Sequence, residues 1–278
     1  MSQTAASPSL PTIAFIGGGN MASAIIGGLI HQGLPASQIE VVEPWAEARE
    51  ALRKNYGIEA QAEAGPALQR AQIVVWAVKP QTFKDAAAQA KAHTQGALHL
   101  SVAAGIRSDS IAQWLGTERI VRTMPNTPAL VGKGMSALYA RPAVSAPERQ
   151  SIEAIMATTG EFLWVDSEPQ LDAVTALSGS GPAYVFYFLE AMTRAGTGMG
   201  LTEQQAHQLA VGTFVGASEL ARRSDDPPSV LRQRVTSKGG TTYAALQSME
   251  AAGVAASFEA AMRAAQHRAH ELGDEFGA

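Results

Sequence analysis

A short apolar run that breaks into three consecutive glycines constrains the fold of this chain more than any other feature. Residues 12–16 are Thr-Ile-Ala-Phe-Ile, residues 17–19 are all glycine, and apolar residues then recur at helical spacing. This order predicts a strand, a tight turn and a helix. Gly17, Gly19 and Ala22 match the spacing G-x-G-x-x-G/A, in which helix N-terminal N–H groups hold a pyrophosphate that only glycine lets come so close. We therefore predict a dinucleotide-binding turn, with a purely structural glycine turn as the alternative.

Composition indicates an ordinary globular protein of about two domains. The 278 residues are 46% hydrophobic, which suffices for a packed core in each domain. A formal net charge of −4 without a basic run argues against a nucleic-acid partner. The sequence holds no cysteine, which excludes disulfides, thiolate metal sites and cysteine nucleophiles.

Two observations favour a cytoplasmic location without a membrane partner. Residues 1–11 are rich in Ser, Ala and Pro and lack the basic and apolar regions of a signal peptide, so they are predicted to be a loose tail. No apolar run approaches the ~20 residues that a helix needs to span a bilayer.

Apolar runs alternate with helical patterns as far as residue 167. The run at 73–78 is continuously apolar, as in a parallel strand buried on both faces. The class is therefore predicted to be α/β, with a Rossmann-type parallel-sheet domain over residues 12–167. Ligands of such sheets lie beyond the carboxyl ends of the strands. We expect the turns at 79–80, 103–105 and 124–128 to face the same crevice as the glycines, with Asn126 toward the nicotinamide.

An acidic residue ends the second expected strand, about twenty residues after the glycine turn. In this architecture, the Glu43 carboxylate can accept a hydrogen bond from the ribose 2′-hydroxyl and would repel a 2′-phosphate. Glu43 therefore favours NAD. The alternative is a solvated acid at a strand end, followed by Pro44.

From residue 168 to residue 278 the chain is predicted to be an all-helical domain. Alanine-rich helical patterns replace the β-branched runs, and a Gly/Ser turn with Pro182 opens a helix. The segment Ala183–Leu189 is apolar on every side of that helix and must be covered all round. We expect a second copy of the chain to cover it, and a monomer with an unusually apolar helix is the alternative.

The residues available for chemistry are few. The six histidines lie outside the strand-end turns and Gly/Ser loops, and neither a Ser-His-Asp order nor metal-ligand spacing is visible, so no metal is expected. Two loops, 178–182 and 237–242, offer backbone N–H groups and hydroxyls that suit a small carboxylate. Hydride transfer to a protonated imine needs little beyond alignment in such a site.

Taken together, these motifs resemble those of the pyrroline-5-carboxylate reductases. The match follows family order and spacing through Ile16-Gly-Gly-Gly-Asn-Met21, Ala77-Val-Lys-Pro80, Ala103-Ala-Gly105, Met124-Pro-Asn-Thr-Pro128, Leu177-Ser-Gly-Ser-Gly-Pro-Ala-Tyr184 and Ser237-Lys-Gly-Gly-Thr-Thr242. The resemblance implies the last step of proline synthesis, in which NADPH or NADH reduces 1-pyrroline-5-carboxylate to L-proline. It also implies a Rossmann domain followed by an all-α dimerisation domain, with a pentamer of dimers in some relatives.

The resemblance also implies roles for individual residues. The cofactor-binding residues that it implies are Ile16, Gly17, Gly18, Gly19, Asn20 and Met21 at the pyrophosphate, and Ala77, Val78, Lys79, Pro80, Ala103, Ala104, Gly105 and Asn126 at the nicotinamide end. Glu43 is expected at the ribose from its place at the strand end. The expected substrate-binding residues are Ser180, Gly239, Gly240, Thr241 and Thr242. Thr242 is the expected catalytic residue, hydrogen-bonded near the imine nitrogen. A side chain at Gly17 or Gly19 is expected to fill the space of the pyrophosphate.

Two departures from the family pattern leave questions open. Many members carry Ser where this chain has Glu43, so the choice between NADPH and NADH is not decided. Many carry Pro where this chain has Lys238, which is either a solvated loop residue or an aid to carboxylate binding. Two other functions remain open: a β-hydroxyacid dehydrogenase with Lys238 as its catalytic lysine, and a non-catalytic NAD(P) sensor.

Overall fold

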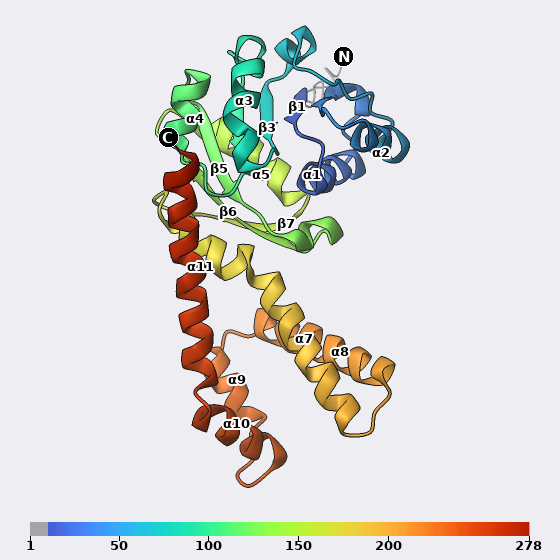
Figure 1. Ribbon diagram of the computed structural model, residues 1–278, viewed down its shortest axis with the longest axis vertical. Helices are drawn as coiled ribbons and strands as arrows, with labels where there is room; N and C mark the ends of the chain where they lie inside the picture. Colours follow the sequence, from blue (N-terminus) through green and yellow to red (C-terminus); the bar gives the residue numbers. More distant parts are fainter. Residues whose placement is uncertain (1–10, 278) are drawn as a thin grey trace, which may run out of the picture. The chain divides into compact units, whose positions relative to one another are not determined.

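The computed structural model describes residues 11–277, which divide into two compact units (Figure 1). The first, called here the sheet unit, comprises residues 11–180 and 265–277. The second, called the helical unit, comprises residues 181–264. Each unit is described by itself. The predicted loose tail falls on residues 1–11, of which 1–10 lie outside the described residues.

Within the described residues, one seven-stranded sheet forms the centre of the sheet unit, in the order β2-β1-β3-β4-β5-β6-β7. The strands are β1 (Ile13–Ile16), β2 (Ile39–Val42), β3 (Ile73–Trp76), β4 (Leu98–Ser101), β5 (Ile120–Met124), β6 (Gly134–Ala140) and β7 (Gly160–Trp164). Neighbouring strands β2, β1, β3, β4 and β5 are all parallel, with Ile13 opposite both Ile39 and Ile73. The sheet therefore brings five strand ends to one edge.

Strand β6 departs from the parallel arrangement. It runs antiparallel to β5, with Thr123 opposite Leu138, while β6 and β7 are parallel. The connection between β5 and β6 holds only the short 3₁₀ segment η4 (Thr127–Val131), and a parallel pair would need a crossover of a dozen residues or more. The predicted α/β class is confirmed, with a sheet that is mostly rather than wholly parallel.

Helices cover both faces of the sheet, as Figure 1 shows. One core lies under α1 (Asn20–His31), α2 (Ala46–Tyr56) and α5 (Ala146–Ala157), and contains Phe15 and Val75. The other lies under α3 (Pro80–Ala90) and α4 (Ser108–Leu115), and contains Ala14 and Trp76. Neighbouring residues of one strand thus enter opposite cores. This explains why the strand sequences are continuously apolar rather than alternating.

The remaining elements of the sheet unit are short, apart from the end of the C-terminal helix. They are the 3₁₀ segments η1 (Ala36–Gln38), η2 (Pro66–Arg70) and η3 (Lys91–His93), helix α6 (Gln170–Val174), the π-helical turn η5 (Thr175–Gly179), and the last part of α11 (Val254–Phe276).

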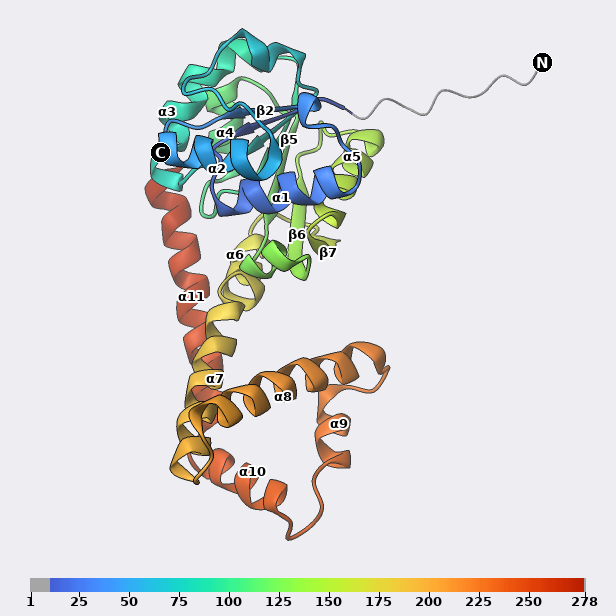
Figure 2. The ribbon, with the colours of Figure 1, turned by 90° about the vertical axis from the view of Figure 1, so that its right-hand side faces the viewer.

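The helical unit contains α7 (Gly181–Gly198), α8 (Glu203–Arg223), α9 (Pro228–Arg234), α10 (Thr241–Ala251) and the first part of α11 (Figure 2). Helix α8 begins with a capping box, because the side chains of Thr202 and Gln205 each accept the other's backbone N–H. Helices α7 and α8 pack closely together. By contrast, α9 and α10 bury none of their residues within the described chain.

The compact units do not divide at the predicted domain boundary of 167/168. Helix α6 contacts β5 and β6, so residues 168–180 join the sheet unit. The end of α11 joins it as well, because Ser110 Oγ donates a hydrogen bond to the carbonyl of Gly277 (2.6 Å). Among the described residues, no helix combines the length and hydropathy needed to cross a membrane.

Candidate functional site

The carboxyl ends of β2, β1, β3, β4 and β5 form a row at one edge of the sheet. The glycine turn lies between two of them: Gly17 donates its N–H to the Val42 carbonyl (2.8 Å), and Ala77 donates to the Ile16 carbonyl (2.8 Å). On the other side of β3, Val102 donates to the Trp76 carbonyl (3.1 Å). The structure therefore brings together the predicted segments 16–21, 77–80 and 103–105. Their contacts with a cofactor stay predictions.

The glycines of the turn serve different ends. Gly17 has φ of +97°, and a Cβ there would lie 2.6 Å from the Ala77 carbonyl oxygen. A side chain at Gly17 would thus collide with the backbone just after β3, and its predicted effect on a pyrophosphate stays a prediction. At Gly19, in contrast, no described atom lies within 4 Å of an added Cβ. The space above Gly19 is open, as a ligand would require.

The beginning of α1 suits the phosphates of a dinucleotide. Gly19 is its N-cap residue, and no side chain among residues 11–277 caps the helix there. The first backbone N–H groups of a helix have no partner within the helix and carry its positive dipole end. The residues present therefore fit a pyrophosphate, because an anion above Gly19 would meet uncapped donors.

Glu43 points inward, toward the glycine turn. Its side-chain Oε2 accepts the N–H of Gly18 (2.7 Å) and its Oε1 accepts the N–H of Trp45 (2.9 Å). Only 6% of Glu43 is exposed. The alternative of a solvated acid is therefore wrong, and the carboxylate lies at the β2 end where a ribose would lie in this fold.

Asn126 connects the loop after β5 to the π-helical turn η5. Its Nδ2 donates to the carbonyl oxygen of Ser178 (3.1 Å), and its Oδ1 accepts the N–H of Met135 (2.9 Å). The two loops also touch at Gly179, where an added Cβ would lie 2.5 Å from Met124 Cε. The predicted loops 124–128 and 178–182 thus meet at Ser178 and Gly179. The Asn126 amide is engaged within the protein, and its predicted contact with nicotinamide stays a prediction.

The other predicted substrate loop lies in the helical unit, at the start of α10. Gly239 has φ of +73°, and Gly240 is the N-cap residue, so Thr241 and Thr242 form the first turn of the helix. No side chain of the described chain caps α10. Uncapped N–H groups at this end suit a carboxylate. Lys238 is exposed, as the solvated-loop interpretation of that residue requires.

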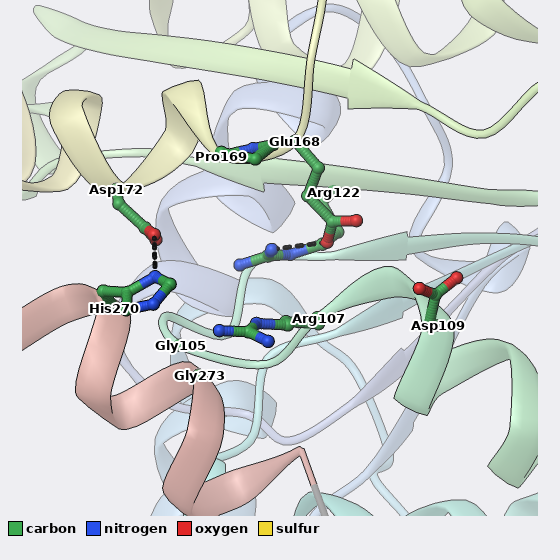
Figure 3. A pocket seen from close by; sticks show the side chains of 9 residues that line it. All are labelled: Gly105, Arg107, Asp109, Arg122, Glu168, Pro169, Asp172, His270 and Gly273. Atoms are coloured by element: carbon green, nitrogen blue, oxygen red, sulfur yellow. Dashed lines mark hydrogen bonds and ion pairs between the residues drawn. The ribbon is translucent and has the colours of Figure 1, made fainter.

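A pocket that we did not predict opens beside the predicted nicotinamide-side residue Gly105 (Figure 3). It has a volume of about 340 Å³. The pocket is lined by Gly105, Arg107, Asp109, Arg122, Glu168, Pro169, Asp172, His270 and Gly273.

Acidic side chains contact an arginine and a histidine across this pocket. Arg122 Nη1 lies 2.6 Å from Glu168 Oε1, and His270 Nδ1 lies 3.4 Å from Asp172 Oδ2, as Figure 3 shows. Arg122 is a charged residue buried within strand β5, which was the one sequence signal for this cluster. The contacts of His270 with Asp172 and of Arg107 with Asp274 (2.6 Å) hold the end of α11 against the rest of the sheet unit. Among residues 11–277, no group of three potential metal ligands occurs.

Comparison with known proteins relates nearly the whole chain to one family. Residues 168–272 match the family described as pyrroline-5-carboxylate reductase dimerisation, and residues 12–105 match NADP oxidoreductase coenzyme F420-dependent. The pyrroline-5-carboxylate reductase of Pseudomonas aeruginosa is 45% identical over 97% of this chain and 99% of its own length. The pyrroline-5-carboxylate reductase of Haemophilus influenzae is 41% identical over 94% of this chain and 97% of its own length.

Solved structures agree with this assignment. A pyrroline-5-carboxylate reductase from Coxiella burnetii superposes with a TM-score of 0.87 at 37% identity, covering 95% of this chain and 98% of its own. The pyrroline carboxylate reductase of Plasmodium falciparum, solved with NADP bound, superposes with a TM-score of 0.86 at 27% identity. The match covers 96% of this chain and 100% of its own. Prephenate dehydrogenase from Aquifex aeolicus shares the fold alone, at 11% identity and a TM-score of 0.54. On this near-complete and consistent similarity, the chain belongs to the pyrroline-5-carboxylate reductase family.

Proposed function

We propose that the chain reduces 1-pyrroline-5-carboxylate to L-proline with NADPH or NADH, as the final step of proline biosynthesis. The observation that carries this proposal is the 45% identity to the Pseudomonas aeruginosa reductase over 97% of the chain. The row of strand ends and the two uncapped helix N-termini, of α1 and α10, add the physical means of holding two anionic molecules.

The sheet unit would bind the cofactor. Its α1 N-terminus would hold the pyrophosphate over Gly19, and the strand-end segments 77–80 and 103–105 would flank the nicotinamide. The nicotinamide ring supplies a hydride when the cofactor is bound. We assign cofactor binding to residues 12–167, and substrate binding and dimerisation to residues 168–278.

Substrate binding would use the start of α10. The backbone N–H groups of Thr241 and Thr242 would donate hydrogen bonds to the substrate carboxylate, assisted by the positive dipole end of the helix. Gly239 and Gly240 add no side chains of their own to the approach to these groups. Ser180, at the other predicted loop, would add a hydroxyl on the ring side.

Thr242 would orient the substrate rather than transfer its proton. The imine nitrogen protonates near neutral pH in water, so the protein needs to bind the iminium and hold its carbon toward the hydride donor. A threonine hydroxyl is a poor acid at neutral pH but a good hydrogen-bonding group.

The family's dimerisation domain, matched by residues 168–272, makes the protein a homo-oligomer. We propose a dimer formed through the helical unit. Phe186 and Tyr187 of α7 are 59% and 66% exposed in the single chain, and α9 and α10 bury no residue there. Apolar helices of this kind need a covering partner. A pentamer of dimers, as some relatives form, would build on that dimer.

A coupled assay tests the function. Purified protein is mixed with 1-pyrroline-5-carboxylate and either NADH or NADPH, and the loss of absorbance of the reduced nicotinamide is matched to the L-proline formed. Equimolar conversion is expected. If the protein instead oxidised β-hydroxy acids with NAD(P) and did not reduce 1-pyrroline-5-carboxylate, it would be the dehydrogenase of the alternative hypothesis. Cofactor binding without turnover of either substrate class would indicate the sensor.

A further inference from the structure

The segment that follows β2, Glu43-Pro44-Trp45, carries an unusually exposed indole on a fixed backbone. Trp45 is 76% exposed, whereas Trp76 is fully buried and Trp114 and Trp164 are half-buried. The backbone N–H of Trp45 donates a hydrogen bond to Glu43 Oε1 (2.9 Å). Arg49 Nη1 donates to the carbonyl oxygens of Glu43 (2.9 Å) and Pro44 (2.6 Å), which fixes the segment from the side of α2.

The Glu43 carboxylate has acceptor capacity for two further donors. The two oxygens of a carboxylate offer about four acceptor positions. The backbone N–H groups of Gly18 and Trp45 occupy one position on each oxygen. Two vicinal hydroxyl groups would match the positions that remain. Since Gly18 belongs to the turn that would hold the pyrophosphate, the sugar attached to that pyrophosphate comes within reach of Glu43.

We propose that Glu43-Pro44-Trp45 recognises the adenosine half of NADH and selects NADH over NADPH. The Glu43 carboxylate accepts hydrogen bonds from the 2′- and 3′-hydroxyls of the ribose. The Trp45 indole covers one face of the adenine. This inference rests on the proposed function and adds to it the choice of cofactor.

The selection follows from charge and from the fixed position of the carboxylate. A 2′-phosphate replaces a donating hydroxyl by a group with two negative charges, next to a carboxylate that two backbone N–H groups hold in place. Burial of Glu43 weakens solvent screening of this repulsion. The neighbouring cation, Arg49, already directs Nη1 at two carbonyl oxygens, so it does not neutralise the carboxylate directly.

The indole supplies affinity without regard to the phosphate. A base stacks on an aromatic side chain through its π-face, and a rigid backbone lowers the entropy lost in ordering the pair. The exposed indole then loses its contact with water when the nucleotide binds. Trp45 should therefore strengthen the binding of NADH and of NADPH equally, whereas Glu43 should favour the binding of NADH.

The test for Glu43 is calorimetric titration of the full-length protein with ADP-ribose and with 2′-phospho-ADP-ribose, which needs no turnover. Wild type is expected to bind ADP-ribose at least about tenfold more tightly. Glu43→Ser and the isosteric Glu43→Gln should narrow or reverse this ratio, and Glu47→Ser, an exposed acid on the first turn of α2, should leave it unchanged. Equal or tighter binding of the 2′-phosphate by wild type would overturn the inference, as would a ratio that Glu43→Gln does not move.

The test for Trp45 combines affinity with fluorescence. Trp45→Ala should weaken the binding of ADP-ribose and of 2′-phospho-ADP-ribose by roughly tenfold, and Trp45→Phe should retain most of the affinity. Saturating ADP-ribose should protect wild-type emission from iodide quenching, because Trp45 is the most exposed of the four tryptophans. Unchanged quenching together with unchanged affinity in Trp45→Ala would remove the indole from the site.

The inference and the proposed function fail in different ways. Turnover of 1-pyrroline-5-carboxylate with a clear preference for NADPH would keep the function and overturn the selection of NADH. If the Arg49→Met variant lost that preference for NADPH, Arg49 would be the residue that binds the 2′-phosphate. Binding of neither nucleotide, with no turnover, would overturn both.

Discussion

The side-chain amide of Asn126 donates a hydrogen bond to the carbonyl oxygen of Ser178, 52 residues further along the chain, at 3.1 Å. The same amide accepts the N–H of Met135 at 2.9 Å, so one side chain ties the loop after β5, the start of β6 and the turn η5 together. Ser180, a predicted substrate-binding residue, directly follows η5. The position of that hydroxyl therefore depends on Asn126.

Replacing this amide should reduce both stability and catalysis. Asn126→Ala should lower the unfolding free energy by about 1–3 kcal/mol, because the Met135 N–H loses its partner. It should also lower kcat/KM by roughly ten- to a hundredfold, because η5 is no longer held. Thr127→Ala, at the exposed next residue, is the matched control for urea unfolding and steady-state kinetics. Lower stability with an unchanged kcat/KM would show that Asn126 positions nothing at the site.

The two outer glycines of the turn should respond differently to the same substitution. Gly17→Ala should destabilise the protein, because the new Cβ would lie 2.6 Å from a backbone oxygen and the residue has positive φ. Gly19→Ala meets open space, so stability should stay within about 0.5 kcal/mol of wild type while the cofactor KM rises. Thermal unfolding and cofactor titration separate the two effects. An unaltered cofactor KM in Gly19→Val would place the pyrophosphate elsewhere.

Thr242 should assist hydride transfer without being indispensable. Loss of one orienting hydrogen bond costs about 0.5–1.5 kcal/mol, or up to ~3 if a charged partner is left unpaired. This corresponds to roughly a few-fold to a hundredfold in kcat/KM. Thr242→Ala and Thr242→Val should therefore be slow enzymes whose pH profiles match wild type. A loss near a million-fold would mean that Thr242 does more than orient, and no loss would move the substrate toward residues 178–182.

The apolar face of α7 should hold the oligomer together. Phe186→Glu places a charge on a residue that is 59% exposed in the single chain and is expected to be covered in the dimer. The dissociation constant should rise by roughly tenfold or more, measured by light scattering over a range of protein concentrations. Lys54→Glu, an exposed charge reversal on α2, is the control. Equal molar masses for Phe186→Glu and wild type at every concentration would exclude this face from the interface.

Stability should fall in mild acid because of a buried histidine. Burial, with a smaller contribution from the Arg119 charge, lowers the pKa of His99 from 6.5 to about 4, and the ring accepts the Trp76 indole N–H at Nδ1 (3.0 Å). Between these pH values the unfolded chain binds a proton that the folded chain does not. The folded state therefore loses about 3 kcal/mol as the pH falls from 6.5 to 4.

Urea unfolding at fixed protein concentration, from pH 7 to pH 4, measures this loss. His99→Gln keeps an acceptor for the indole and does not titrate, so its stability should depend less on pH over this interval. His31→Gln removes an exposed histidine and should follow wild type. The same pH dependence in His99→Gln and wild type would assign the acid sensitivity to other groups.

Local sequence determined most of the secondary structure and the order of the strand-end motifs. Apolar runs specified buried parallel strands, and the capping pair of Thr202 and Gln205 specified the start of α8. The end of α2 at Gly57, with φ of +68°, follows from a glycine's access to left-handed backbone. Each of these features depends on residues within one or two turns of chain, so it can be predicted without knowledge of the fold.

Tertiary structure decided where the side chains of the site point. The sequence allowed Glu43 to face solvent or the glycine turn, and the choice follows from the pairing of β1 with β2, which brings the Gly18 N–H to its carboxylate. The pocket of Arg122, Glu168 and His270 gathers residues from three distant segments, and Asn126 finds its partner in a fourth. Hydrogen bonds and ion pairs form between groups that the folded backbone brings within about 3 Å. Sequence spacing alone therefore predicted the loops of the candidate site, and only the packed sheet fixed which atoms of its strand-end loops meet.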